Sequence, residues 1–406
     1  MDRASRLTAL RRLFEYIQSN HGGLLPLLER SNVIVRDHRD NRNDAIIHNQ
    51  PLLRTDDLQR LMSHEVLGIH VRGFYPRNAA EELGRELSDQ ALGISDSNSS
   101  GNRGTLRNWS VSVGGMEKSD VWTLGSHPPY NVAVGESSIK EGEDAYFEGV
   151  RDELSSRRRT RRTSKQGTES DNDDVKNDNR NINNNNGSYV DRPTLWPLDL
   201  LRLELDEAWP GGSGLAREDT PTWWKKWWSF YTSSFSSLSS PPTPPRPPRP
   251  FSAGLPRIMI GPTRWKEGHV HVDDMAPLDP KKGVFSANVY LRLPPPDDND
   301  KKSEDDVREG RDALQIWPLG IRSRWDWYRN AGILSGLSTQ DASSQVELRS
   351  ELGPPIVLNV EPGDLVMLCV QRPHAAIGFD AEGSTRVSLQ CFLRHGGEDE
   401  RLLIDI

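Results

Sequence analysis

The spacing of apolar residues predicts helices in the first half of the chain. In residues 6–18, leucines and two other apolar residues recur every three or four positions, which gives a helix one apolar face. Further helices are expected over residues 56–63, 76–87 and 141–156. The helix over 76–87 starts with Pro76, whose missing N–H is harmless in a first helical turn.

Other apolar runs predict strands. Residues 66–74 read as a strand, and residues 198–205 alternate between apolar and polar positions as a strand would. From Leu255 onward the chain is nearly all strand and turn, with strands expected over residues 255–261, 268–274, 283–293, 313–318, 356–360 and 365–374 and from residue 385. Several short strands separated by turns predict a jelly roll, so the fold class is α+β.

Composition divides the chain further. Of 406 residues only 34% are hydrophobic, and polar residues gather in a few segments, so the compact part is shorter than the chain. Residues 157–190 begin with an arginine run, continue as an Asn-rich tract and are expected to be a disordered insert. We therefore expect an N-terminal helical and mixed region over 1–156 that packs on a barrel, and a catalytic β region over 191–406 with a Trp/Ser/Pro-rich insert at 217–250.

Three features of the inserts leave alternatives open. The aromatic stripe at 223–235 suits a lid or a membrane-surface anchor, and equally a helix packed on the domain. The polyproline segment 241–250 is a spacer or a weak ligand for an SH3-type partner. The basic run 157–162 is interpreted as a solvated helix end rather than a nucleic-acid or nuclear-import signal.

Charge and targeting signals narrow the class of protein. The net charge is −8, which argues against a specific nucleic-acid partner. The chain has no apolar run long enough to span a membrane and no secretory signal, and its two cysteines, Cys369 and Cys391, lie in apolar runs typical of buried free thiols. We expect a cytoplasmic protein, with import into an organelle left open.

The candidate chemistry centres on the segment Gly268–Asp274. In an extended strand, His269, His271 and Asp273 point the same way. An imidazole and a carboxylate two residues apart supply two thirds of a 2-His-1-carboxylate triad, which holds Fe(II) and leaves its opposite face open. The third ligand is expected to be His374, at the end of an apolar strand far along the chain.

Twelve residues after His374, a strand opens with Arg386 and Ser388 on one face. A guanidinium beside a hydroxyl suits a carboxylate bound through both its oxygens. With His271, Asp273 and His374, these residues resemble the pattern of the Fe(II)/2-oxoglutarate-dependent oxygenases, which is His-x-Asp, a distal His and then Arg-x-Ser.

The resemblance implies a double-stranded β-helix, the cofactor Fe(II), the cosubstrate 2-oxoglutarate, and O2. Arg386 and Ser388 would bind the distal carboxylate of 2-oxoglutarate, and Asn288 or Tyr290 on a neighbouring strand would touch it. The expected reaction is hydroxylation, desaturation or cyclisation of a small molecule, with release of succinate and CO2. Halogenating relatives lack the carboxylate ligand, whereas Asp273 is present here.

Alternatives remain at the level of the whole protein and of single residues. The chain could be a protein or peptide hydroxylase of the same superfamily, or a cupin-like scaffold without activity. His374 could be a satisfied core histidine, and Arg386 could form a surface salt bridge. His269 is assigned to the surroundings of the metal or to the pocket wall, not to the ligands.

Overall fold

The computed structural model describes most of the chain beyond the N-terminal segment. The described residues are 22–39, 51–94, 105–111, 119–125, 127–136, 139–166, 195–218, 247–295, 313–339 and 341–405, with four single residues, 8, 12, 15 and 16. The Asn-rich tract, the aromatic stripe and most of the polyproline segment lie outside them, as does nearly all of the helix expected over 6–18.

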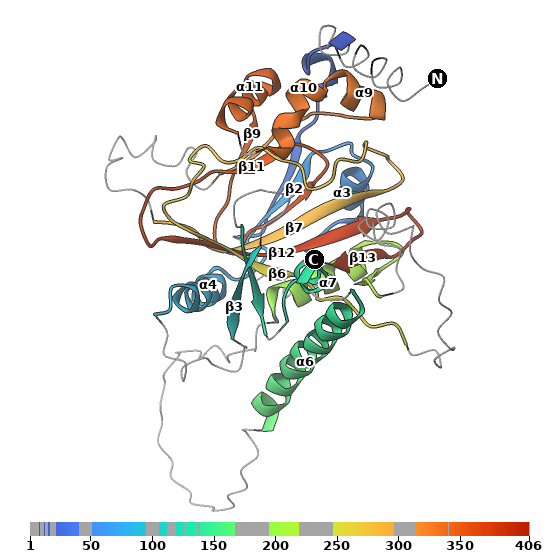
Figure 1. The fold of residues 1–406 in the computed structure, drawn as a ribbon. Coiled ribbons are helices and arrows are strands. Elements are labelled where there is room, and N and C mark those ends of the chain that lie inside the picture. Colours follow the sequence, from blue (N-terminus) through green and yellow to red (C-terminus); the bar gives the residue numbers. More distant parts are fainter. Residues whose placement is uncertain are drawn as a thin grey trace, which may run out of the picture.

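A large sheet forms the centre of the molecule (Figure 1). Its path runs β1–β2–β10–β7–β12–β13–β5, and β6 pairs with β12 beside it. In chain order these strands are β1 (Val33–Asp37), β2 (Gly68–Arg72), β5 (Ser213–Leu215), β6 (Leu255–Ile260), β7 (Gly283–Arg292), β10 (Leu365–Cys369), β12 (Thr385–His395) and β13 (Leu402–Asp405). The two longest, β7 and β12, are antiparallel neighbours.

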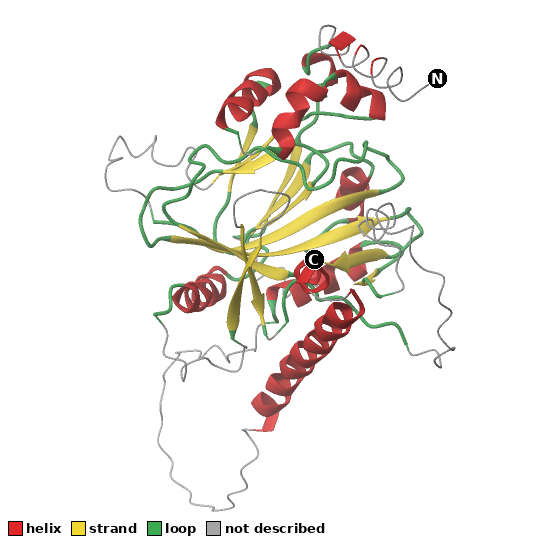
Figure 2. Ribbon diagram, in the orientation of Figure 1, coloured by secondary structure: helices red, strands yellow, loops and turns green. Residues whose placement is uncertain are grey.

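Two smaller sheets accompany it. One has the order β11–β8–β9, formed by β8 (Ala313–Ile316), β9 (Ile356–Asn359) and β11 (His374–Ala376). The other is the pair β3 (Leu106–Val111) and β4 (Ser119–Leu124). Helices lie on both sides of the sheets (Figure 2). They are α3 (Thr55–Met62), α4 (Arg77–Ala91), α5 (Tyr130–Glu136), α6 (Ile139–Gln166), α7 (Pro197–Ala208), α9 (Arg324–Arg329), α10 (Ala331–Leu334) and α11 (Ala342–Leu352), with short 3-10 turns at Leu25–Leu27 and Ser335–Ser338.

The large sheet buries different cores on its two faces, because successive side chains of a strand point to opposite sides. On the face we call outer, Phe285, Ala287 and Val289 of β7 pack with buried leucines of α3, α4 and α7. On the inner face, Tyr290 of β7 packs with Ile316 of β8 and other apolar residues of the smaller sheet. Of the candidate site residues, Tyr290, Arg386 and Ser388 lie on this inner face.

Helix α4 approaches the outer face closely. A Cβ built at Gly84 would lie 2.7 Å from the Leu291 carbonyl oxygen of β7, a contact that no larger residue can make without displacement. The two cysteines, Cys369 and Cys391, are buried free thiols, as expected, and burial raises their pKa values to about 11 and about 12. No helix in the described part of the chain is long and apolar enough to cross a bilayer.

Several expected elements are confirmed. Helices α3, α4 and α6 and strands β2, β6, β7, β8 and β9 lie where the apolar spacing predicts them. The mixed architecture of one large sheet and several helices agrees with the α+β expectation.

The structure also corrects four expectations. Residues 198–205 form helix α7, because Leu198, Leu201 and Leu205 recur at helical spacing and are all buried on one side. The C-terminal third is not all strand, since α9, α10 and α11 lie within it. Helix α6 continues to Gln166, so residues 157–166 of the expected disordered insert are helical. Finally, the N-terminal region does more than pack on the barrel, since β1 and β2 are strands of the large sheet.

Candidate metal centre

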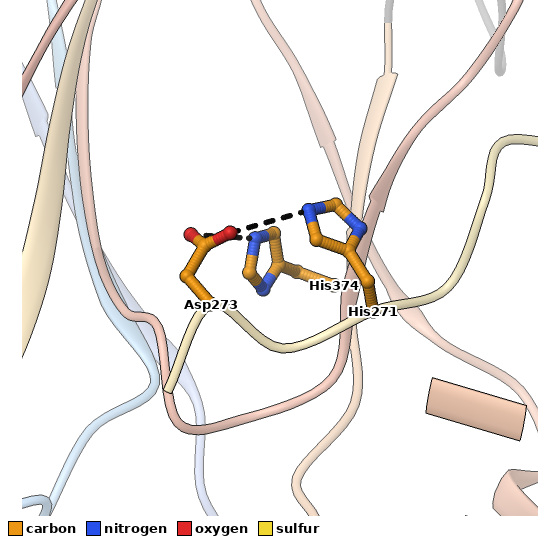
Figure 3. Close-up of side chains that lie close together, drawn as sticks. All are labelled: His271, Asp273 and His374. Carbon is orange, nitrogen blue, oxygen red and sulfur yellow. Dashed lines mark ion pairs between the residues drawn. The ribbon is translucent and has the colours of Figure 1, made fainter. Parts of the chain in front are cut away.

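Three side chains from two distant segments converge (Figure 3). His271 Nε2 lies 3.5 Å from one carboxylate oxygen of Asp273, and His374 Nε2 lies 3.6 Å from the other. One nitrogen or oxygen of each side chain falls within 4.8 Å of the corresponding atoms of the other two. Two imidazoles and one carboxylate at this separation can all reach a single ion placed between them, and the donor set suits Fe(II).

Backbone pairing between His271 and His374 brings the segments together. The His271 N–H donates to the His374 carbonyl over 3.1 Å, and the His374 N–H returns the bond over 3.0 Å. The Asp273 N–H donates to the Val370 carbonyl over 3.0 Å. The His271–His374 pairing is an isolated bridge, so the segment around His271 is not the regular strand expected for residues 268–274. The apolar strand before His374 likewise ends at Cys369, and His374 opens the separate strand β11.

Side chains of helix α11 hydrogen-bond to the backbone of the segment that carries His271, which has no strand ladder. The Gln345 amide accepts from the Val270 N–H over 2.9 Å and donates to the Val270 carbonyl over 3.0 Å. One turn further along, Arg349 donates to the carbonyls of Glu267 and Gly268. Val270 lies between two histidines, so the amide of Gln345 orients the backbone that carries His271.

Each ligand imidazole is oriented by a hydrogen bond from its other nitrogen. His271 Nδ1 lies 2.9 Å from the carbonyl oxygen of His269, and His374 Nδ1 lies 2.9 Å from that of Arg372. A carbonyl oxygen only accepts, so Nδ1 carries the proton in both rings. Each Nε2 then presents its lone pair to the space between the three side chains, which is the tautomer that a metal requires.

The electrostatics favour an ionised Asp273 and a neutral His271, and they favour protonation of His374 in the absence of a metal. Burial raises the pKa of Asp273, but His374, His271 and Arg257 outweigh it and lower the pKa to about 2. Burial and the neighbouring His374 lower the pKa of His271 to about 4. For His374, burial opposes protonation, but the carboxylate of Asp273 raises the pKa above its usual value. An ionised carboxylate beside a neutral His271 is the state in which a metal binds.

Arg386 and Ser388 lie on strand β12 and are both buried. The Arg386 guanidinium lies 5.4 Å from the centre of the Phe379 ring, and its Nη1 is 3.9 Å from Met259 Sδ. It is therefore not a surface salt bridge. Ser388 is directly opposite Tyr290 of β7, and side chains directly opposite each other share a face, so Ser388 lies on the inner face.

Asn288 and Tyr290 also lie on this face. Gln390 of β12 is opposite Asn288, whose amide is 3.5 Å from the Ser286 hydroxyl. Burial raises the pKa of Tyr290 to about 12, although the nearby Arg386 lowers it. Tyr290 is thus a cross-strand neighbour of Ser388, and Asn288 lies opposite Gln390, one same-face position further along β12.

His269 lies beside the ligands but outside the group of three. Its ring stacks on His271 at 5.6 Å between centroids and 11° between planes. Its Nε2 lies 2.9 Å from the Thr339 carbonyl, so this nitrogen is directed away from the converging atoms.

Sequence reasoning missed Gln345, Arg349 and Arg257. The first two belong to helix α11, which no sequence pattern predicted. Arg257 is different, because the alternation of β6 places it on the face opposite Ile258, a buried residue of the outer core. That alternation was visible in the sequence, but the position of β6 beside β12 was not.

Comparison of the sequence with family models and with curated proteins gives no match. Among solved structures, an N-substituted L-amino acid dioxygenase from Burkholderia ambifaria AMMD in complex with alpha-KG is 12% identical, with a TM-score of 0.39, over 87% of this chain and 91% of that one. A second structure of an N-substituted L-amino acid dioxygenase from the same organism is 17% identical, with a TM-score of 0.25, over 39% of this chain and 55% of that one. Both TM-scores are low, so the function of this chain is argued from its own residues.

Proposed function

We propose that this protein is an Fe(II)- and 2-oxoglutarate-dependent dioxygenase that oxidises a small molecule within a double-stranded β-helix. The observation that carries the proposal is the meeting of His271, Asp273 and His374, whose potential ligand atoms all lie within 4.8 Å of one another, with both Nδ1 atoms occupied by carbonyl oxygens. A satisfied core histidine does not need a second imidazole and a carboxylate at the same place. A scaffold without a metal would not need His271 and His374 both to be protonated at Nδ1.

The remaining roles follow from position. His271, Asp273 and His374 would hold Fe(II) and leave three coordination positions for cosubstrate and O2. Arg386, buried and on the inner face, would pair with the distal carboxylate of 2-oxoglutarate, with the Ser388 hydroxyl beside it. Asn288 or Tyr290 would contact the same molecule from β7.

Iron and 2-oxoglutarate bound there would supply the oxidation chemistry, in which one oxygen atom of O2 enters succinate, CO2 leaves, and the other atom enters a hydroxylated product. Desaturation or cyclisation would release that second oxygen atom as water. The protein's own contribution is orientation. Gln345 and the carbonyls of His269 and Arg372 fix the two imidazoles, and the burial of Arg386 strengthens its pairing with a carboxylate.

The proposal is tested by anaerobic titration of the protein with Fe(II) in the presence of 2-oxoglutarate. We expect a weak visible charge-transfer band in the wild-type protein. Asp273→Ala should lose the band, with Fe(II) affinity falling by more than the roughly hundredfold typical of changes outside the ligand set. Arg386→Gln should keep iron and need more 2-oxoglutarate to develop the band.

Asp274→Ala is the matched control, because Asp274 is the adjacent carboxylate and its Oδ1 accepts from the Ala276 N–H instead of facing the histidines. It should bind iron like the wild type. Unchanged Fe(II) affinity in Asp273→Ala would refute the ligand assignment, and the enzyme assignment with it.

A further inference from the structure

We propose that Arg257 binds an anionic group of the primary substrate, a carboxylate being the simplest, so that this enzyme selects negatively charged small molecules. The inference rests on the proposed dioxygenase function and adds the substrate class to it.

Strand register places Arg257 beside the proposed cosubstrate site. In the β6–β12 ladder, Arg257 is directly opposite Ser388, and Met259 is directly opposite Arg386. Directly opposite residues of an antiparallel pair project to the same face. Arg257 therefore shares the inner face with Ser388 and Arg386, while its neighbour Ile258 is buried in the outer core.

The Arg257 guanidinium is enclosed by protein yet open to solvent. Its side chain is exposed, although the surrounding protein disfavours its charge and lowers its pKa. The Asp273 carboxylate acts electrostatically on Arg257, so this guanidinium lies on the side of the sheet where the candidate metal centre is found.

Within the described part of the chain, Arg257 makes no hydrogen bond and no ion pair, not even with Asp273. The other arginine of this face, Arg386, is buried against Phe379 and Met259. A guanidinium has five N–H donors in a planar fork that matches a carboxylate. Left open to solvent beside a reaction centre, this fork is available for a ligand.

With the proposed iron and 2-oxoglutarate bound, the charges counted below would favour one more anion. Iron brings two positive charges, and Arg257 and Arg386 bring one each. Asp273 brings one negative charge and 2-oxoglutarate two, which leaves one positive charge in a partly desolvated space, where uncompensated charge is costly. One carboxylate on the substrate neutralises it, and Arg257 is the group placed to receive it.

The test uses the full chain with Fe(II) and 2-oxoglutarate and measures succinate release. The probes are aliphatic, aromatic and amino-acid carboxylates, each paired with its neutral primary amide. We expect stimulation by one or more carboxylates and not by the matching amides. In Arg257→Gln, the KM for the stimulating carboxylate should rise about tenfold to hundredfold, as expected for the loss of a hydrogen bond between charged groups. Arg257→Lys should restore part of the affinity.

The controls separate this proposal from the dioxygenase assignment. Arg257→Gln should still develop the anaerobic charge-transfer band, at the same 2-oxoglutarate concentration as the wild type. Arg85→Gln, on the exposed side of the outer helix α4, should behave as wild type.

Three results would overturn the inference in a protein that still forms the iron and 2-oxoglutarate complex. They are equal stimulation by acids and amides, no response to any carboxylate, or a weakened affinity for 2-oxoglutarate in Arg257→Gln. The last would mean that Arg257 holds the cosubstrate. Loss of the charge-transfer band in the wild type would instead contradict the dioxygenase function itself.

Discussion

At the residue scale, His64 shows how tertiary packing sets the chemistry of a side chain. Its backbone adopts φ 64, which is uncommon outside glycine, and its ring stacks on Phe285 at 5.4 Å. Its carbonyl accepts from Arg372 Nη2 over 3.2 Å, and its own Nε2 lies 3.2 Å from the Asp279 carbonyl. Burial and the charge of Arg372 lower the pKa of His64 from 6.5 to about 4. The ring is therefore neutral in the folded protein at pH 7.

This pKa shift predicts a pH-dependent loss of stability. Between pH 6.5 and about 4 the unfolded chain protonates His64 and the folded chain does not, so the free energy of unfolding falls as the pH falls through this window. The full effect is of order 3 kcal/mol, at about 1.4 kcal/mol for each pKa unit. Asparagine tolerates a positive φ, so His64→Asn should fold like the wild type. Between pH 7 and pH 4.5, we expect its free energy of unfolding to fall by about 1–3 kcal/mol less than that of the wild type.

Urea unfolding at the two pH values measures this difference. Because other histidines titrate equally in both proteins, the comparison isolates His64. Identical pH dependence in the two proteins would mean that His64 is not buried as a neutral ring.

At the element scale, side chains of helix α11 make the backbone hydrogen bonds around Val270 that a strand ladder would make elsewhere in the fold. The segment carrying His271 and Asp273 is joined to neighbouring strands by an isolated bridge and the Asp273–Val370 bond instead of a regular ladder. Gln345 supplies both a donor and an acceptor to Val270, and it also donates to the Gly336 carbonyl over 2.7 Å. The positions of the proposed metal ligands thus depend on a helix that supplies none of the three.

We therefore predict that Gln345→Leu weakens metal binding without touching a ligand. The substitution leaves the buried N–H and carbonyl of Val270 without partners, which costs about 1–3 kcal/mol for each unpaired group. Affinity for Co(II), a spectroscopic substitute for Fe(II), should fall about tenfold to hundredfold. Titration followed by visible absorption measures it.

Glu347→Leu is the matched control, because Glu347 lies on the exposed side of the same helix. It should bind Co(II) like the wild type. Equal affinities in all three proteins would show that the ligand segment holds its position without α11.

At the scale of the whole molecule, the N-terminal third is part of the central sheet. Strand β2 pairs with β10, which leads into the segment that ends at His374. The outer core joins leucines of α3 and α4 to β7, β10 and β12. In addition, the buried His70 of β2 lies 2.8 Å from the Asp364 carboxylate in the turn before β10.

A chain restricted to residues 191–406 should therefore not fold cooperatively, although composition alone suggests a separate catalytic region. Removing β1, β2, α3 and α4 exposes the edge of β10 and one side of the outer core. We expect no sigmoidal urea transition and strong binding of the dye ANS, measured by circular dichroism and fluorescence against the full chain. A cooperative transition in the short chain would show that the N-terminal strands are dispensable.

The local pattern of apolar residues was enough to predict many of the helices and strands of this protein. Helices α3 and α4 follow from the 3.6-residue period, because each buries one apolar face, and β7 follows from its long apolar run, which is buried on both faces. The motif residues His271, Asp273 and His374 could be selected because side-chain chemistry restricts which residues bind a metal. Helix α7 was mistaken for a strand because leucines alternate with polar residues over 198–200 and again over 201–205. The burial of Leu198, Leu201 and Leu205 shows that the helical period governs.

Taken by itself, the sequence determined which groups are present and the elements whose burial is local: the two imidazoles, the carboxylate, the arginines, and the strongly periodic helices and strands. Only the tertiary structure decided that β2 joins the sheet, that a buried Gln345 orients the segment carrying His271, and that Arg257 lies opposite Ser388. The physical reason is that these features depend on partners far apart in the chain. The same glutamine or arginine is a solvated surface residue, or a positioned functional group, according to which distant segment packs against it.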